Sequence, residues 1–447
     1  MSSAAEQLAA NINLKAFANA TDLKKRIWFT LAVLVVYRFG SYIPLPGINP
    51  EIMSEIARQN AGGILGMFDM LSGGALSRMT IFALNIMPYI TASIIVQLLT
   101  AVYPPFEALK KEGEMGRKKL NQYTRYGTVV ICAAQAYGLA VGLENMTGSG
   151  QSAVLDPGIF FRLTTVITLV GGTVFLMWLG EQITARGIGN GISLIIFSGI
   201  VANLPQAIMG TLELGRTGAL SVLVILGVVI CAVAVVAFIV FMERAQRRVL
   251  VQYPKRQVGQ KMYGGESSHL PLKLNSAGVI PPIFASSLLL LPITLASLLQ
   301  GDGTEWYSRI GFYLSQGNWL YIAFYLSMIV FFAFFYTAIV FNPEETADNL
   351  KKSGGFILGI RPGEKTAQYF DYILTRLTVA GAAYLAFVCA LPEIVKLYYT
   401  FPFYFGGTSL LIVVSVTMDT VAQVHSHLIS HQYEGLLKKT RLKGRRR

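Results

Sequence analysis

Long uncharged runs of apolar residues, separated by shorter polar and basic segments, dominate the 447-residue chain. A helix rises about 1.5 Å per residue and a bilayer's hydrocarbon core is about 30 Å thick, so about 20 apolar residues can cross it. Runs of about that length predict ten transmembrane helices and an all-α polytopic membrane fold. They cover residues 27–43, 79–102, 126–143, 160–179, 188–208, 219–242, 279–299, 319–341, 373–394 and 405–429.

One apolar stretch is too short to cross a bilayer. Residues 64–71 lie between the glycine pairs Gly62-Gly63 and Gly73-Gly74, and as a helix they reach only about 12 Å. Backbone polar groups in lipid must find partners within the protein, so such a short hinged helix belongs inside protein or beside a watery cavity. This re-entrant piece and the span after it therefore predict a pore or a transport path.

The charge distribution predicts the orientation of the chain. Apolar residues make up 53% of the sequence and charged residues only 14%, against about a quarter charged in soluble domains. Of the 37 Lys and Arg residues, 29 fall on one side of the predicted spans and 4 on the other. Basic residues in short loops stay cytoplasmic, so both termini are expected in the cytoplasm. This asymmetry explains the net charge of +13 without a nucleic-acid ligand.

The spans divide into two groups of five around an outer loop. An odd number in each group makes the two halves insert with opposite orientation, the arrangement of inverted-repeat transport proteins. The expected parts are a cytoplasmic segment with an amphipathic helix (1–26), the N-terminal half (27–208) with its re-entrant region (62–78), an outer hinge loop (209–218), the C-terminal half (219–429) and a basic cytoplasmic tail (430–447).

Two cytoplasmic loops, 244–275 and 342–372, are far longer than the usual connection of about 4 to 6 residues. The first carries Lys255 and Arg256 beside a potential strand and turn, and the second presents Arg361 before Pro362-Gly363. They could be solvated basic loops of the ordinary kind. Their length and turn chemistry favour a docking surface for a large cytoplasmic partner, including one that bears phosphates.

The sequence offers little chemistry of its own. Hydrolase, zinc-protease and nucleotide-binding motifs are absent, so a membrane enzyme lacks its catalytic constellation and no cofactor or metal is expected. A small-solute secondary transporter on an inverted-repeat scaffold remains the alternative to a passive channel. A carrier of that kind would need ionisable groups near mid-membrane, whereas Glu181 and Asp371 lie at span ends.

Five blocks of sequence are distinctive. They are FDMLSGGALSRMTIFALNIMPYITASIIVQLL, GEQITARGIGNGISLIIFSGIV, YPKRQVGQKMYGGESSHLPLKLNSAGVIPPIFASS, GGFILGIRPGEKTAQYFDYILTRLT and GGTSLLIVVSVTMDTVAQVHSHLISHQYEGLLKK. These blocks resemble the SecY family of bacterial protein-translocation channels, and they occur in the family's order along nearly the whole chain.

This resemblance implies an hourglass pore in the bacterial inner membrane. Such a pore passes unfolded secretory proteins across the membrane and releases transmembrane segments sideways into lipid. By resemblance, four groups of residues carry this work. They are a pore ring (Ile86, Ile90, Ile192, Ile196, Ile283, Ile412), a plug (Ile64, Phe68, Leu71), a lateral gate (Thr91, Gln135, Asn275) and a docking surface (Arg361, Lys255, Arg256).

The resemblance also implies partners. Expected are the subunits SecE and SecG, the SecA ATPase or the ribosome at the basic loops, signal sequences and secretory or nascent polypeptides in the pore, and membrane lipid at the gate. The energy for transport would then come from outside this chain.

Overall fold

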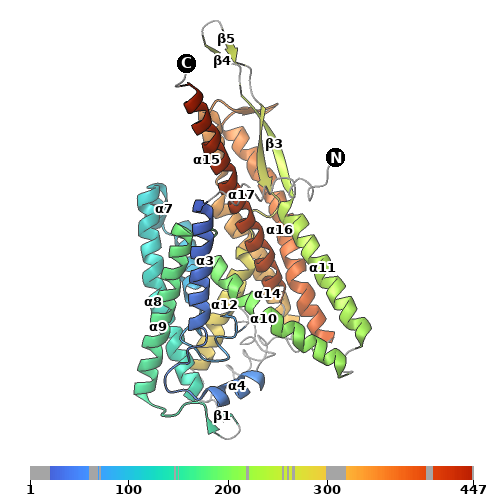
Figure 1. Ribbon diagram of the computed structural model, residues 1–447. Coiled ribbons are helices and arrows are strands. Elements are labelled where there is room, and N and C mark those ends of the chain that lie inside the picture. Colours follow the sequence, from blue (N-terminus) through green and yellow to red (C-terminus); the bar gives the residue numbers. More distant parts are fainter. Residues whose placement is uncertain are drawn as a thin grey trace.

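The computed structural model describes residues 21–59, 69, 72–144, 147–148, 151–217, 221–253, 256–258, 261–263, 267–298, 319–398 and 406–444. Long helices make up most of this part (Figure 1). Each of the ten expected spans overlaps one of them. These helices are α3 (Thr21–Gly40), α6 (Met87–Val102), α8 (Glu114–Glu144), α9 (Ile159–Arg186), α10 (Gly191–Arg216), α11 (Val222–Arg244), α12 (Ile280–Leu298), α14 (Trp319–Val340), α16 (Glu364–Tyr398) and α17 (Gly407–Gly444).

Within the described residues, seven helices are long and apolar enough to cross a membrane by themselves. An eighth span arises if α6 is joined to α7 (Pro104–Lys111), which follows it across a bend of 97°. The helices α3 and α12 are not among these seven. The all-α membrane fold is confirmed, and the division into two inverted halves stays a prediction.

The second span starts later than the sequence pattern suggests. We expected a continuous helix from residue 79, but residues 79–86 form turns and α6 begins at Met87. Met79 and Asn85 have positive φ angles of 43° and 50°, which an α-helix cannot contain. Pro88 then occupies the first turn of α6, where its missing N–H costs nothing.

Helix ends also differ from the expected boundaries. The outer hinge loop was expected at 209–218, but residues 209–216 belong to α10, where the Thr217 N–H donates to the Glu213 carbonyl. The expected tail at 430–447 begins inside α17, which continues to Gly444. Hydropathy reports where lipid begins, whereas caps and backbone hydrogen bonds decide where a helix ends.

The two long basic loops fold together. Strand β3 (Gln246–Gln252) lies between β6 (Ser267–Lys273) and β7 (Phe356–Ile357), both antiparallel to it. We call these strands and α15 (Pro343–Lys352) the basic-loop unit. Together with the start of α16 it encloses an apolar core, which contains Val249, Leu272, Ala347, Ile357 and Phe370. A hairpin of β4 (Arg256–Val258) and β5 (Lys261–Tyr263) extends from it (Figure 1).

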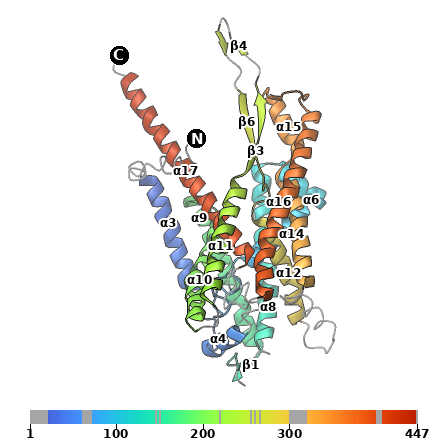
Figure 2. The ribbon, with the colours of Figure 1, turned by 90° about the vertical axis from the view of Figure 1, so that its right-hand side faces the viewer.

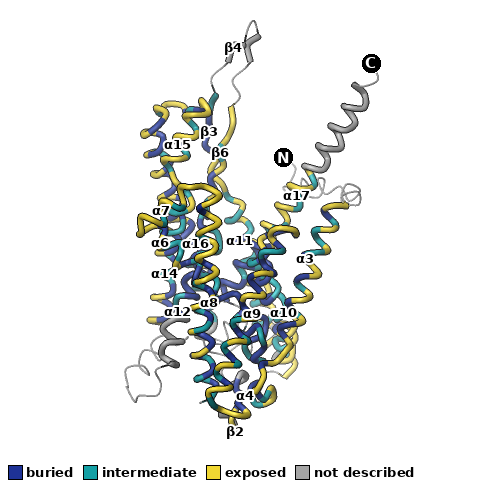
Figure 3. The backbone as a smooth tube through the Cα atoms, turned by 90° about the vertical axis from the view of Figure 1, so that its left-hand side faces the viewer, coloured by how far each residue is buried: buried dark blue, intermediate teal, exposed yellow. Residues whose placement is uncertain are grey.

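The ends of the molecule are distinct. The basic-loop unit, the start of α3 and the end of α17 lie at one end, while α4 (Pro50–Gln59), β1 (Thr147–Gly148) and β2 (Gln151–Ser152) lie at the other (Figure 2). Buried residues gather where the helices converge between these ends (Figure 3). The first and last described helices thus place their outer termini on the same side of the fold.

Candidate functional site

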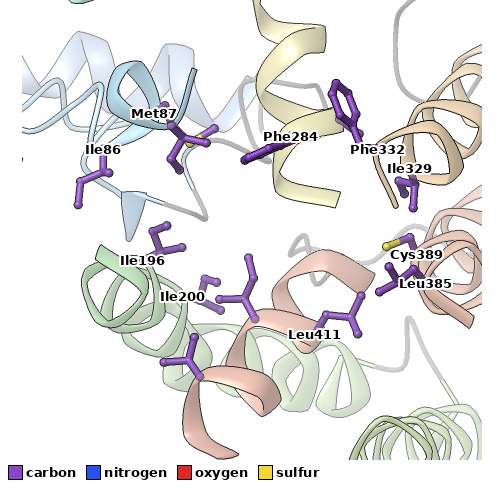
Figure 4. Packing of buried hydrophobic residues seen from close by; sticks show 14 of the residues in the cluster. Ile86, Met87, Ile196, Ile200, Phe284, Ile329, Phe332, Leu385, Cys389 and Leu411 are labelled. Atoms are coloured by element: carbon purple, nitrogen blue, oxygen red, sulfur yellow. The ribbon is translucent and has the colours of Figure 1, made fainter. Parts of the chain in front are cut away.

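One apolar cluster receives side chains from both expected halves of the chain. Figure 4 shows Ile196 and Ile200 of α10 facing Phe284 of α12 and Leu411 of α17 across a shared interior. Ile86, just before α6, points into the same region. Helices far apart in the sequence therefore meet around one apolar centre.

All six isoleucines of the expected ring belong to this cluster. Four are buried with 7% or less of their surface exposed, and two are partly buried and pack against the others. The buried four are Ile86, Ile90, Ile196 and Ile412; the other two are Ile192 and Ile283. They share one core instead of scattering over the lipid-facing surface, and their role as a constriction stays a prediction.

Local sequence explains how α10 presents two of these side chains. The Asn190 side chain caps the helix by accepting from the Ile192 N–H at 3.1 Å. Ile192 and Ile196 are four residues apart and so lie on one helix face. Gly180 and Gly191 let α9 and α10 approach so closely that a Cβ on Gly191 would collide with the Gly180 carbonyl.

The expected plug residues Ile64, Phe68 and Leu71 lie outside the described residues. The hinge that follows them is described from Asp69 and Ser72 onward. The Ser77 N–H donates to the Asp69 carboxylate at 2.6 Å, and the Gly74 N–H donates to the Asp69 carbonyl at 2.8 Å. Burial raises the pKa of the Asp69 carboxyl, an effect that its hydrogen bonds from Ser77 oppose.

This hinge is fastened to α3 and pressed against α10. The Tyr37 hydroxyl donates to the Ser72 carbonyl at 3.2 Å, and Arg38 Nη1 donates to the Gly73 carbonyl at 2.9 Å. Gly73 has a φ of 70°, and a Cβ there would lie 2.9 Å from the Cα of Gly199 in α10. Only glycine suits that position. The sequence alone did not predict the hydrogen bond from Arg38 to Gly73, although a charged Arg38 within an apolar span was a signal for a buried partner.

The expected gate residues are buried, but the hydrogen bonds of Thr91 and Asn275 do not join them to one another. The helices α6, α8 and α12 pack against one another, and α12 also packs against α14. The Thr91 hydroxyl donates to Met87 O within its own helix at 3.1 Å. Asn275 Nδ2 donates to Glu243 Oε1 at 2.8 Å. Gln135 on α8 is buried as well. A joint role of these three residues at the lateral gate stays a prediction.

Two ion pairs join the neighbouring helices α8 and α9. Arg125 makes two hydrogen bonds to the Glu181 carboxylate, at 2.9 and 2.7 Å. Arg162 makes two more to one oxygen of Glu144, at 3.0 and 2.6 Å. The two pairs add to the packing of α8 against α9 at two separate places along the helices.

The expected docking residues sit in or beside the basic-loop unit. Arg361 is exposed just before α16, and the Thr366 hydroxyl donates to its carbonyl oxygen at 2.9 Å. Gly363, with a φ of 106°, completes this turn. Arg256 begins β4 opposite Tyr263, and Lys255 lies outside the described residues. The structure thus brings the two basic loops together, which the sequence alone did not predict.

Comparison with known families decides the identity. The model of the SecY family matches residues 80–421, about three quarters of the chain. The chain belongs to the SecY family. Two relatives, both described as protein translocase subunit SecY, come from Rickettsia conorii and Escherichia coli K12. Each is 57% identical, over 425 and 424 residues that cover 95% of this chain and 98% and 96% of the relative. The expected SecY resemblance is confirmed.

Solved structures share the SecY fold. One described as a protein-conducting channel has a TM-score of 0.61 and 20% identity, over 91% of this chain and 93% of its own. Another, from work on the plug domain that stabilises the closed state of SecY, has a TM-score of 0.61 and 22% identity at the same coverage. Canine Sec61, bound to a ribosome, has a TM-score of 0.58, 20% identity and again 91% and 93% coverage. These matches do not support the alternative of a small-solute transporter.

Proposed function

We propose that this chain is the central pore-forming subunit of a Sec protein translocase in a bacterial cytoplasmic membrane. It passes unfolded secretory proteins across the bilayer and releases transmembrane segments sideways into lipid. The observation that carries the proposal is the shared apolar cluster, to which α6 and α10 of one half and α12 and α17 of the other all contribute isoleucines.

The physics of such a cluster suits a polypeptide channel. Bulky aliphatic side chains around a narrow neck cannot replace the water around an ion, so an idle neck stays dry and blocks leakage. The same side chains make no sequence-specific demand on a passing peptide. Selectivity then consists of tolerating extended polypeptides of any sequence and refusing small ions.

Two further parts of the proposed channel are the hinge of the plug and the seam through which transmembrane segments leave. Residues 64–71 close the outer funnel as a plug, with the fastened hinge around Gly73 as its fixed end. The seam between α6–α8 and α12–α14 opens towards lipid when a hydrophobic signal sequence enters. Hydrogen bonds between helices in a membrane are worth about 1 kcal/mol each, enough to hold a seam that a signal sequence can still open.

The basic-loop unit is the cytoplasmic docking surface. It lies at the same end of the fold as the start of α3 and the end of α17 (Figure 2), which agrees with cytoplasmic termini. Exposed Arg361, together with Lys255 and Arg256, would bind the SecA ATPase or the phosphates of ribosomal RNA. SecE and SecG would be the membrane partners of the complex.

Reconstitution tests this function. Vesicles that contain the full chain with SecE and SecG should take up a secretory precursor only when SecA and ATP are supplied. A solute carrier would instead move its solute down an ion gradient without SecA. Precursor uptake that is absent with every component present, or independent of SecA and ATP, would contradict the proposal.

A further inference from the structure

The entry to α12 contains a hydrogen bond that neither the ring nor the docking surface explains. Asn275 lies in the short connector between β6 and α12, with 4% of its surface exposed. Its Nδ2 donates to Glu243 Oε1 at 2.8 Å and to the Gly278 carbonyl at 3.1 Å. Glu243 belongs to the last turn of α11. A carboxylate from one helix thus fixes the turn from which another helix starts.

Further contacts hold the same connector. The Leu274 N–H donates to the Ala245 carbonyl, directly after α11, at 2.9 Å. Gly381 of α16 packs tightly against the connector. A Cβ on Gly381 would lie 3.1 Å from the Leu274 carbonyl oxygen and 3.5 Å from Asn275 Cα. The start of α12 is therefore set by α11 and α16.

The body of α12 makes different contacts. It packs against α6 and α8 of the N-terminal half, and against α14. The helix α12 consequently bridges the two expected halves. Its first residues are fixed by α11 and α16 of the C-terminal half, and its length packs against α6 and α8 of the N-terminal half. Any change in the direction of its first turn changes how it closes against α6 and α8.

We propose that Glu243 is a positioning residue of the seam, which acts by holding Asn275 and with it the first turn of α12. The inference rests on the proposed channel function and names a residue that helps keep the channel closed. Without the carboxylate, the buried Asn275 amide loses an acceptor, and the closed packing of α12 loses part of its stability. Because the connector continues β6 directly, movement of the basic-loop unit reaches α12 through this same turn.

The experiment compares two precursors in vesicles that contain the full-length channel, SecE, SecG, SecA and ATP. One precursor has an intact signal sequence, and the other has a charged residue in the apolar core of its signal. The variants are Glu243→Ala, Glu243→Gln, Asn275→Ala and the double variant Glu243→Ala/Asn275→Ala. The matched control is Glu213→Ala, because Glu213 is an exposed acidic residue near the end of α10.

Glu243→Ala should raise transport of the defective precursor about tenfold, because a seam that lost one buried hydrogen bond needs less help from the signal. Transport of the intact precursor should remain. Glu243→Gln keeps an acceptor oxygen and should behave like the wild type, as should Glu213→Ala. The double variant should match Asn275→Ala, because the two substitutions remove the same hydrogen bond between Asn275 and Glu243.

A general loss of stability would lower transport of both precursors, so a selective gain distinguishes positioning from a merely structural role. Wild-type stringency in Glu243→Ala, or additive effects in the double variant, would overturn the inference. If Glu243→Ala does not accumulate, Glu243→Asp decides, because the shorter carboxylate cannot reach Asn275 equally well and must also relax the stringency. If the wild type transported neither precursor, that result would contradict the proposed channel function and not the role of Glu243.

Discussion

Arg38 and Arg78 donate hydrogen bonds to the same acceptor, the carbonyl oxygen of Gly73, at 2.9 and 3.0 Å. Both guanidinium groups also lie over the ring of Tyr42, with Cζ 5.3 and 4.2 Å from its centroid. Two like charges converge on one hinge residue, where a carbonyl oxygen and an aromatic face both favour cations. The fixed end of the proposed plug is therefore held by α3 and by the turn that leads into α6.

Removing one of these arginines should unseat the plug. Arg38→Met keeps a long apolar side chain but loses the hydrogen bond to Gly73, which as a bond to a charged group is worth about 1.5–3 kcal/mol. We expect a higher resting ion conductance in vesicles without precursor. The control is Arg216→Met, because Arg216 is an exposed basic residue at the end of α10. Equal resting conductance in Arg38→Met and wild type would show that this contact does not hold the seal.

Polar substitution in the ring should wet the neck. Ile86→Asn and Ile412→Asn each place an amide in the apolar cluster, so water and ions should enter more easily and the need for a strong signal sequence should fall. Transport of a signal-defective precursor and resting conductance measure the two effects. The matched control, Ile230→Asn, changes an isoleucine on α11 that is 60% exposed. If the ring variants behaved like this control, their isoleucines would not form the constriction.

Reversing the charge of Arg361 should impair docking without unfolding the protein. Arg361 is exposed and its turn is held through backbone groups of Arg361 and Gly363, so Arg361→Glu leaves these bonds in place. SecA-driven precursor transport should fall by about tenfold or more, as expected for loss of a close charge pair at an interface. Insertion of the variant into the membrane should equal that of the wild type. The control Arg216→Glu, at the opposite end, should transport normally, and normal transport by Arg361→Glu would refute the docking role.

The basic-loop unit should depend on its small core. Ile357 in β7 is 6% exposed, whereas its neighbour Leu358 is 67% exposed. Ile357→Ala should lower the local free energy of unfolding by about 2–4 kcal/mol, because it leaves a cavity under the sheet. Leu358→Ala should change it by less than about 0.5 kcal/mol. Hydrogen exchange of the β3 amides measures both. Similar protection in the two variants would show that β7 does not stabilise the unit.

Much of this molecule follows from the sequence read locally. The cost of placing polar groups in lipid acts on each segment separately, so hydropathy alone indicated ten segments that each overlap a long helix of the fold. The quoted blocks, among them GEQITARGIGNGISLIIFSGIV, indicated the family before any contact was known. The same blocks identified six isoleucines that share one cluster in the fold. Local pattern was weaker at helix ends, as at Met87, because turns with positive φ carry no hydropathy signal.

Which residues meet was decided only by the tertiary structure. Arg38 reaches Gly73 across 35 positions, and Asn275 reaches Glu243 across 32. The pairing of Val251 with Ile357 joins two loops that are separated by two transmembrane helices. A sequence states which groups need partners, because burial without a partner is costly, but many partners would satisfy that need. The packing of the helices selects one partner from among them, and in this protein that selection forms the hinge at Gly73, the three-stranded sheet and the turn that leads into α12.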